Sequence, residues 1–457
     1  MNHMILPMTS GMTENGMINR LHFRLKVLMR RFGLVTALIL AILVSLILSV
    51  GLWRSPGRDL KNASDADATK QVVAAKSVTG LYDLDQLVYN QKDGQYMVVD
   101  YRPTTTKMIK RLADWQMTFD KKERLSNKGY LKALAQTNTM VMAFPDAVAG
   151  NIVDDMLSGD LDLPTNAEIS RIRVPMGDAN TVAFFDDKKR IVYRYKVTSA
   201  AKTMASFKMS SETVPVAYRL NGKHLLTDTL SDVSLRSYSY LMETNGTNNY
   251  LSSLFAGTTT PSATRKGDSL TYNDGSSRQM TLNTNSGVVH FDAYDVDNVG
   301  DDFNERMRMG YDWLVRIHQI PDNIYFFESH DMGRNLTYRL YVNGLPIYNQ
   351  TTYGTVQIKQ HDVRHEEIDF SQYSLQVPLP ADNDSRATLS DSAAVYKQLA
   401  DIGISKKQVV DLAYGYRWVS DTTENVVTLQ PEWYFEVGDK WQAVKDAIAD
   451  AQQEGDD

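Results

Sequence analysis

The feature that most constrains this chain is an uncharged, apolar segment that runs from Phe32 to Trp53. Roughly 22 residues without a charge are long enough to cross the hydrocarbon core of a bilayer as an α-helix. Basic residues precede the segment: Arg20, Arg24, Lys26, Arg30 and Arg31. Because basic residues flanking a membrane span stay in the cytoplasm, residues 1–31 are predicted to be cytoplasmic and the bulk of the chain extracytoplasmic.

The apolar segment is too long for a typical cleaved signal peptide, and no cleavage site of small residues follows it. We therefore expect an uncleaved signal anchor and a single-pass protein of the cell membrane. The basic residues before the segment can also contact anionic lipid headgroups of the inner leaflet. Met17 is an alternative start to Met1, since five methionines crowd the first 17 residues.

Within the apolar segment, small residues recur at every fourth position: Gly33, Ala37, Ala41, Ser45 and Ser49. Residues four apart form one ridge of a helix, and small side chains let two membrane helices approach closely. The pattern predicts a partner-binding face for a different protein or for a second copy of this chain, as a homodimer. The alternative is that these are only the small residues common in membrane helices.

Composition and motifs exclude several classes of function. The chain has no cysteine, which excludes cysteine zinc sites, iron–sulfur clusters, thiol nucleophiles and disulfides. Its net charge of -6 argues against nucleic-acid binding, which requires a basic surface. No glycine-rich phosphate-binding loop and no G-x-S-x-G nucleophile elbow is present. We predict that the chain is not an enzyme and binds no cofactor.

Three polar stretches contain the residue types of metal or catalytic sites. His361 and His365 lie four apart in a strand-like pattern, which would separate them by roughly 13 Å and prevent chelation. Glu328-Ser329-His330-Asp331 has the residue types of a triad, but neighbouring side chains diverge, so a polar turn is favoured. The acidic run Asp292, Asp295, Asp297, Asp301 and Asp302 lacks the spacing of a calcium loop and is interpreted as a turn with helix caps. No metal site is predicted.

The remaining pattern is typical of an α+β protein with antiparallel sheets. The predicted division is as follows: cytoplasmic segment 1–31, transmembrane helix 32–53, stalk 54–80, three mixed extracytoplasmic domains at 81–208, 209–300 and 301–445, and acidic tail 446–457. The last two domains share an order of helix followed by strands, which hints at a structural repeat.

Local patterns add specific expectations. A strand is expected to end at Pro145. A helical stretch is expected near Asp232–Met242. A helix is expected over Phe303–His318 with Asp301 and Asp302 as caps. Asp274-Gly275 and Asn343-Gly344 are expected to form hairpin turns.

Four segments resemble the YycH family of membrane-anchored regulators of the WalK/WalR (YycG/YycF) two-component system. They are NYLSSLFAG (249–257), LTYNDGSSRQM (270–280), YRLYVNGLPIYNQ (338–350), and AYGYRW with VVTLQPEWYFEVGDKW (413–441). They are turn and packing signatures, and the likeness covers nearly all of the chain.

The resemblance implies three extracytoplasmic domains, the last two similar in fold to the companion protein YycI. It implies a non-enzymatic regulator of the sensor histidine kinase WalK, acting through transmembrane-helix contacts in a complex with YycI and so controlling cell-wall homeostasis. The alternative is a cell-envelope binding module that recognises wall polymer or lipid-linked sugar through an aromatic cleft, with Tyr238, Tyr240 and Tyr250 as candidate lining. A second rival, an anchored wall hydrolase, has no motif in its support.

Overall fold

The computed structural model describes residues 76–456. Short gaps interrupt this range at 158, 160, 178–179, 200–203, 205–211, 259, 295–299, 319–320, 350–351, 362–363, 381–384 and 422–424. The predicted transmembrane helix and most of the predicted stalk lie outside the described residues. Among the helices that are described, none combines the length and the apolar character needed to cross a membrane.

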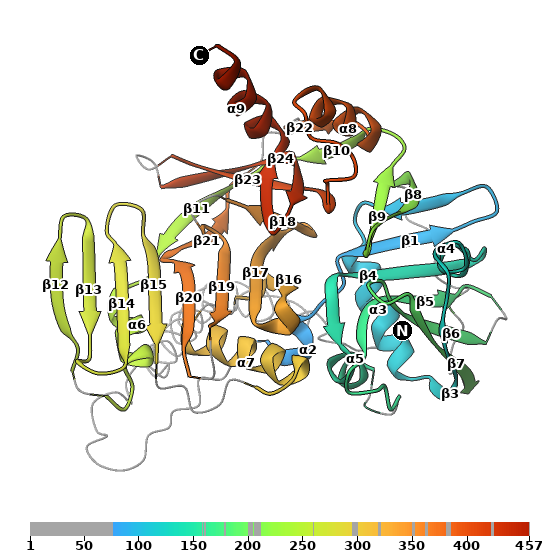
Figure 1. Ribbon diagram of the computed structural model, residues 1–457, viewed down its shortest axis with the longest axis horizontal. Coiled ribbons are helices and arrows are strands. Elements are labelled where there is room, and N and C mark those ends of the chain that lie inside the picture. Colours follow the sequence, from blue (N-terminus) through green and yellow to red (C-terminus); the bar gives the residue numbers. More distant parts are fainter. Residues whose placement is uncertain are drawn as a thin grey trace, which may run out of the picture. The chain divides into compact units, whose positions relative to one another are not determined.

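The described helices are short, and strands predominate (Figure 1). The helices are α2 (Val78–Leu81), α3 (Arg102–Ala113), α4 (Asn127–Leu134), α5 (Gly150–Met156), α6 (Thr247–Leu254), α7 (Phe303–Arg316), η3 (Asp331–Gly333), α8 (Ser392–Asp401) and α9 (Val444–Asp456). The protein is therefore of the α+β class, as the sequence predicts.

Strands β1 to β9 form one nine-stranded antiparallel sheet in the order β3-β7-β6-β5-β4-β1-β2-β8-β9. Their bounds are β1 (Gln86–Asn90), β2 (Gln95–Val98), β3 (Gln116–Arg124), β4 (Thr139–Ala149), β5 (Glu168–Pro175), β6 (Thr181–Asp186), β7 (Ile191–Ser199), β8 (Thr213–Asn221) and β9 (His224–Thr229). Strands β5, β6 and β7 form an antiparallel meander.

A second sheet of fourteen strands contains most of the later chain, in the order β12-β13-β14-β15-β20-β19-β17-β18-β23-β24-β11-β21, with β16 paired to β17 and β25 to β24. Its strands are β11 (Tyr238–Thr244), β12 (Ser262–Lys266), β13 (Ser269–Asn273), β14 (Arg278–Asn283), β15 (Val288–Ala293), β16 (Ile324–His330), β17 (Asn335–Val342), β18 (Leu345–Tyr348), β19 (Thr355–Gln360), β20 (Glu366–Ser371), β21 (Tyr373–Pro378), β23 (Asp411–Asp421), β24 (Val426–Val437) and β25 (Lys440–Ala443). A separate two-stranded sheet pairs β10 (Val233–Arg236) with β22 (Arg386–Leu389).

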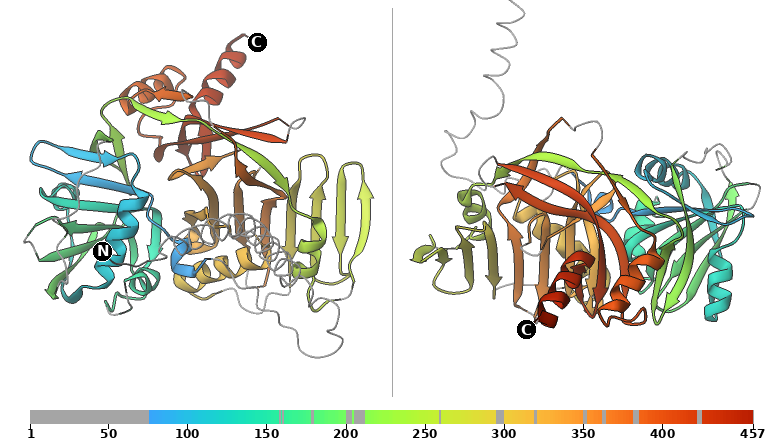
Figure 2. Two further views of the ribbon diagram at one scale, coloured as in Figure 1. Left: turned by 180° about the vertical axis from the view of Figure 1, so that it is seen from behind. Right: turned by 90° about the horizontal axis from the view of Figure 1, so that it is seen from above.

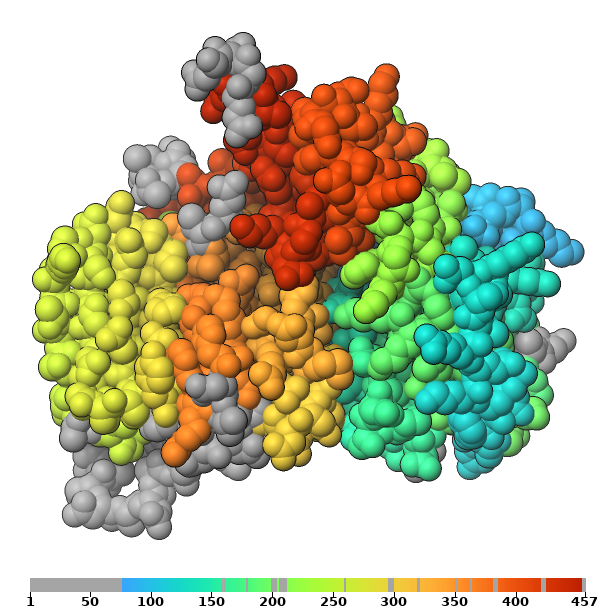
Figure 3. All heavy atoms as spheres, in the orientation of Figure 1, coloured from blue at the N-terminus to red at the C-terminus, as the bar shows by residue number. Residues whose placement is uncertain are grey.

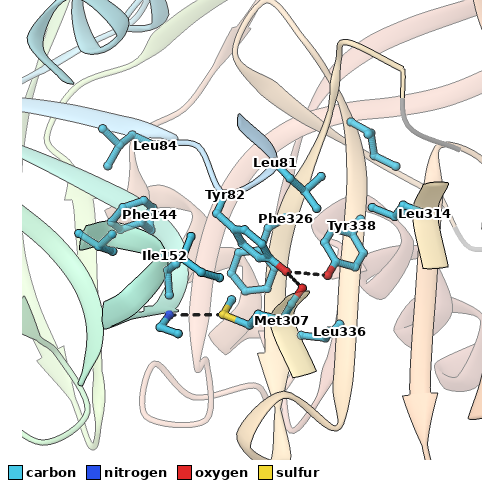
Figure 4. Packing of buried hydrophobic residues seen from close by; sticks show 14 of the residues in the cluster. Leu81, Tyr82, Leu84, Phe144, Ile152, Met307, Leu314, Phe326, Leu336 and Tyr338 are labelled. Carbon is cyan, nitrogen blue, oxygen red and sulfur yellow. Dashed lines mark hydrogen bonds between the residues drawn. The ribbon is translucent and has the colours of Figure 1, made fainter. Parts of the chain in front are cut away.

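One hydrophobic core spans both large sheets. Tyr82 lies at its centre, between Ile152 of α5 and Phe326 of β16 (Figure 4). The Tyr82 hydroxyl donates to the Met307 carbonyl and lies 3.0 Å from the Tyr338 hydroxyl. The two sheets are thus joined by buried apolar contacts together with satisfied hydroxyl groups.

The later helices make a second connection between the two sheets. Figure 3 shows the C-terminal residues, in red and orange, against the lime-green strands β8 and β9. There the Thr229 amide donates to the Ser392 hydroxyl over 2.8 Å, and the Tyr396 hydroxyl donates to Asp228 over 3.0 Å. Helix α9 then projects away from the strands toward the C-terminus (Figure 2).

Two local expectations are wrong. Strand β4 does not end at Pro145 but continues to Ala149, with a register shift between Ala143 and Val148. Proline is tolerated there because the ladder is already interrupted at the bulge. The stretch Asp232–Met242 is not helical: β10 and β11 occupy it, because β22 and β24 offer strand edges that override a weak local preference.

Other local expectations are confirmed. Helix α7 begins after Asp302, whose carboxylate accepts from the Glu305 amide over 2.9 Å. Asn343 and Gly344 both adopt positive φ angles of 47° and 84° in the tight turn between β17 and β18. Such a turn favours Asn-Gly because both central positions are left-handed.

Candidate functional site

A cavity of about 180 Å³ lies between the nine-stranded and the fourteen-stranded sheets. Its floor comes from β1, β2, β4 and β9, and its opposite wall from β16, β18, β23 and the hairpin of β24 and β25. A second cavity of about 150 Å³ adjoins it and shares Asp85, Asp146, Lys188, His224 and Asp411 with it. The structure therefore places a candidate binding site where the two sheets meet.

Acidic side chains dominate the titratable groups of the larger cavity. Five carboxylates line it: Asp85, Asp146, Glu328, Asp411 and Glu436. The basic lining residues are Lys188, His224 and His330. Lys188 pairs with Asp146 at 3.2 Å, and in the described part of the chain no lysine or arginine pairs with the other four carboxylates.

This excess of carboxylates changes the proton affinity of the cavity. Burial raises the pKa of Asp85 to about 7 and that of Asp411 to about 6. Burial and the nearby Glu328 carboxylate raise the pKa of Glu436 to about 8. The Glu328 carboxylate also raises the pKa of His330 to about 9. Desolvation outweighs the attraction of nearby cations, which are Arg171 for Asp85 and Asp411 and His330 for Glu436. Ionisation of these acids is therefore costly, and the cavity favours their protonated forms.

Asp146 connects the two walls of the cavity. The register shift in β4 includes Pro145 and Asp146, and Asp146 Oδ2 accepts from the Ser329 amide of β16 over 3.0 Å. The Ser329 hydroxyl lies 3.3 Å from the same oxygen. The bulge therefore sets the position of β16, and with it the positions of Glu328 and His330.

Aromatic rings form the apolar part of the lining: Tyr101, Phe327, Tyr348, Tyr414, Trp433 and Trp441. Phe327 packs on Tyr348 and Trp441 with ring centroids 5.5 and 5.4 Å apart. The Tyr101 hydroxyl donates to the Gly344 carbonyl over 2.7 Å, which ties the β17–β18 turn to the segment between β2 and α3. Two of the four segments that resemble the YycH family, 338–350 and 413–441, therefore contribute to this wall.

The predicted partner-binding face, Gly33, Ala37, Ala41, Ser45 and Ser49, lies outside the described residues. It stays a prediction, as does the division into three extracytoplasmic domains.

His361 and His365 do not lie on one extended strand. They flank the turn between β19 and β20, where the His361 amide donates to the His365 carbonyl over 3.1 Å. Their rings stack with centroids 4.7 Å apart, so the expected separation of roughly 13 Å, based on strand geometry, is wrong. His361 contacts Glu367 at 2.8 Å and His365 contacts Asp292 at 3.1 Å.

The acidic run is divided among different roles. Asp292, on β15, faces His290 and His365 at 3.1 Å each. Asp302 caps α7, and the Asp301 amide donates to Glu305 over 2.8 Å. Asp295 and Asp297 lie outside the described residues.

The three tyrosines proposed for a carbohydrate cleft do not form one. Tyr250 is 1% exposed and packs edge-on against Phe370 in the core. Tyr238 and Tyr240 are only partly exposed on β11, and Tyr238 packs edge-on against Tyr416. The aromatic cleft built on these residues is therefore wrong, because the fold uses Tyr250 as a core residue.

The sequence did not reveal the cavity. Glu328 and His330 belong to the polar stretch Glu328-Ser329-His330-Asp331, but no local signal connects them to Glu436 or Asp85. The local pattern indicates only that Glu328 and His330 share a face, since residues two apart on a strand point to the same side.

Comparisons with known proteins agree with this architecture. The model of the YycH protein N-terminal domain matches residues 34–211, and that of the YycH protein C-terminal domain matches residues 229–452. A crystal structure of YycH from Bacillus subtilis is similar, with a TM-score of 0.65 and 14% sequence identity, covering 81% of this chain and 97% of that chain. No match was found among curated proteins. Because the two domain models match in order over nearly the whole sequence, the chain belongs to the YycH family of membrane-associated regulators of the WalK/WalR two-component system.

Proposed function

We propose that the chain regulates the sensor histidine kinase WalK through contacts between transmembrane helices, in a complex with YycI, and so controls cell-wall homeostasis. The observation that carries the proposal is the start of the N-terminal family match at residue 34, inside the apolar segment. A segment shared with the family model is expected to do more than attach the chain to lipid. The anchor helix would thereby be part of the regulatory device.

In this proposal the ridge Gly33, Ala37, Ala41, Ser45 and Ser49 packs against a partner helix. In lipid, helices associate through close packing, and small side chains allow it. The extracytoplasmic domains would bias that packing, which shifts WalK between two signalling states. Basic residues 20–31 would hold the cytoplasmic end at anionic headgroups.

The test enlarges two ridge positions, Ala37→Leu with Ala41→Leu, in the full-length chain. We expect co-purification with WalK and YycI to fall by about tenfold or more, which corresponds to roughly 1.4 kcal/mol of lost packing. Output from WalR target promoters should change in the same cells. The matched control, Ile39→Phe with Leu43→Phe, adds bulk to the opposite face of the helix and should leave both readouts near wild type.

Crosslinking from positions along the helix separates the partners. Products with WalK or YycI from ridge positions support the proposal, whereas products that contain only two copies of this chain assign the ridge to a homodimer. Unchanged co-purification and unchanged promoter output in the Ala37→Leu, Ala41→Leu variant would show that the ridge faces lipid.

A further inference from the structure

One corner of the cavity contains a histidine and two glutamates from two separate strands. Glu328 and His330 lie two residues apart on β16 and share a face, and Glu436 reaches them from β24. A nitrogen of His330 and carboxylate oxygens of both glutamates all lie within 4.8 Å of one another. A small adjustment of the side chains would bring three ligand atoms onto a single ion.

The Glu436 carboxylate and one nitrogen of His330 lack a hydrogen-bond partner in the described part of the chain. The Glu436 residue is 7% exposed, and its carboxylate accepts no hydrogen bond and forms no ion pair there. His330 Nε2 is buried without a hydrogen-bond partner, and the nearest Glu328 oxygen is 3.7 Å away. Buried polar groups are costly unless something compensates them, and a bound cation would satisfy both at once.

Neighbouring side chains already orient the other ligand atoms. Trp441 Nε1 donates to Glu328 Oε2 over 2.8 Å. On the far side of the imidazole, His330 Nδ1 faces Asp439 Oδ1 at 3.6 Å, which leaves Nε2 directed at the glutamates. Metal-binding histidines are usually oriented by a carboxylate at their second nitrogen, and metal-binding carboxylates are themselves hydrogen-bonded.

We propose that Glu328, His330 and Glu436 bind one divalent transition-metal ion of the zinc class, with the cavity leaving a further coordination position open. A set of one imidazole and two carboxylates suits zinc, whereas calcium and magnesium prefer oxygen ligands alone. The ion would join β16 to the β24–β25 hairpin. This proposal concerns the extracytoplasmic domains alone and does not depend on the partner of the membrane helix.

A second group, His290, Glu367 and Asp369, provides the natural control. Here the ligand atoms are already paired: His290 Nδ1 lies 2.7 Å from Asp369, and Lys359 contacts Glu367 at 2.6 Å and Asp369 at 3.1 Å. A cation would have to displace Lys359. The two groups have the same chemistry but differ in whether a cationic partner is already present.

The test uses the full-length chain in detergent, stripped with a chelator and dialysed against micromolar ZnCl₂. We expect one zinc per chain by elemental analysis and a thermal midpoint several degrees above that of the stripped protein. Glu436→Gln and His330→Gln should each abolish both effects, while His290→Asn should retain them. Co²⁺ in place of zinc should give the visible absorption bands of a low-coordinate site in the wild type and in His290→Asn only.

Circular dichroism and thermal melting of the stripped variants establish that each variant folds. Glu436→Gln removes an uncompensated buried acid, so without metal it should be at least as stable as the wild type. The proposal is overturned if the wild type binds no zinc, if folded Glu436→Gln binds as much zinc as the wild type, or if only His290→Asn loses it.

Discussion

At the scale of single residues, the unpaired carboxylates of the cavity are the most informative groups. Asp85, directly before β1, lines both adjoining cavities and has no ion pair with a described lysine or arginine. Its pKa of about 7, raised by burial from 3.8, means that the folded chain holds this proton where the unfolded chain releases it. The stability from this proton is full below pH 3.8 and is lost as the pH rises through 7.

Asp85→Asn therefore should stabilise the fold more at pH 8 than at pH 5. The expected gain at pH 8 is about 1–3 kcal/mol, because the amide needs no buried charge. Urea denaturation at both pH values measures the difference. The exposed Asp232→Asn serves as control and should show no such dependence on pH. An equal gain for Asp85→Asn at pH 5 and pH 8 would contradict the assignment.

At the scale of elements, the contact between α7 and β17 depends on one glycine. A Cβ at Gly310 would lie 2.0 Å from the Tyr338 hydroxyl and 2.8 Å from Leu336 Cδ1. Glycine usually weakens a helix interior, so its presence here reflects the close approach of the strand. The same Tyr338 hydroxyl also meets Tyr82, so the position of α7 is linked to the central core.

We expect Gly310→Ala to lower the free energy of unfolding by about 1–3 kcal/mol, because overpacking outweighs the gain in helix propensity. Urea denaturation followed by circular dichroism measures the loss. Adding Tyr338→Phe removes the atom nearest the new methyl group and should recover part of the lost free energy of unfolding. A Gly310→Ala protein as stable as the wild type would show that α7 can shift away from β17 at little cost.

At the scale of the whole molecule, the first described residues bind to elements far along the chain. Lys76 Nζ donates to the Asp322 and Ile324 carbonyls over 2.8 and 2.6 Å, and the Tyr311 hydroxyl donates to the Lys76 carbonyl over 2.9 Å. Tyr82 continues this contact into the core (Figure 4). The end of the predicted stalk, from Lys76 onward, is thus attached to elements of the C-terminal sheet.

This attachment predicts a difference between two soluble fragments. A fragment that starts at Val72 should unfold cooperatively, whereas one that starts at Asp83 loses Lys76, Leu81 and Tyr82. The loss of the buried Leu81 and Tyr82 side chains should cost about 3 kcal/mol or more. Tyr82→Phe within the longer fragment removes one hydroxyl and should cost only about 1 kcal/mol. Equal denaturation midpoints for the two fragments would show that the first residues add nothing to the fold.

Features that depend on residues close together in the sequence can be predicted without the structure. A membrane segment is predicted from hydropathy over 32–53. The Asp302 cap and the Asn343-Gly344 turn follow from local backbone preferences. The α+β class and the family likeness follow from many such local patterns in order. These predictions need no knowledge of which strands pair.

Contacts between distant parts of the chain determine what those elements build together. Asp232–Met242 became strands because its partners, β22 and β24, lie more than a hundred residues later. The stacking of His361 on His365, and the meeting of Glu328 and His330 with Glu436, likewise depend on turns and sheet packing. Local patterns specify side-chain direction within an element, whereas a cavity arises from non-local contacts between elements, which no single window of sequence contains.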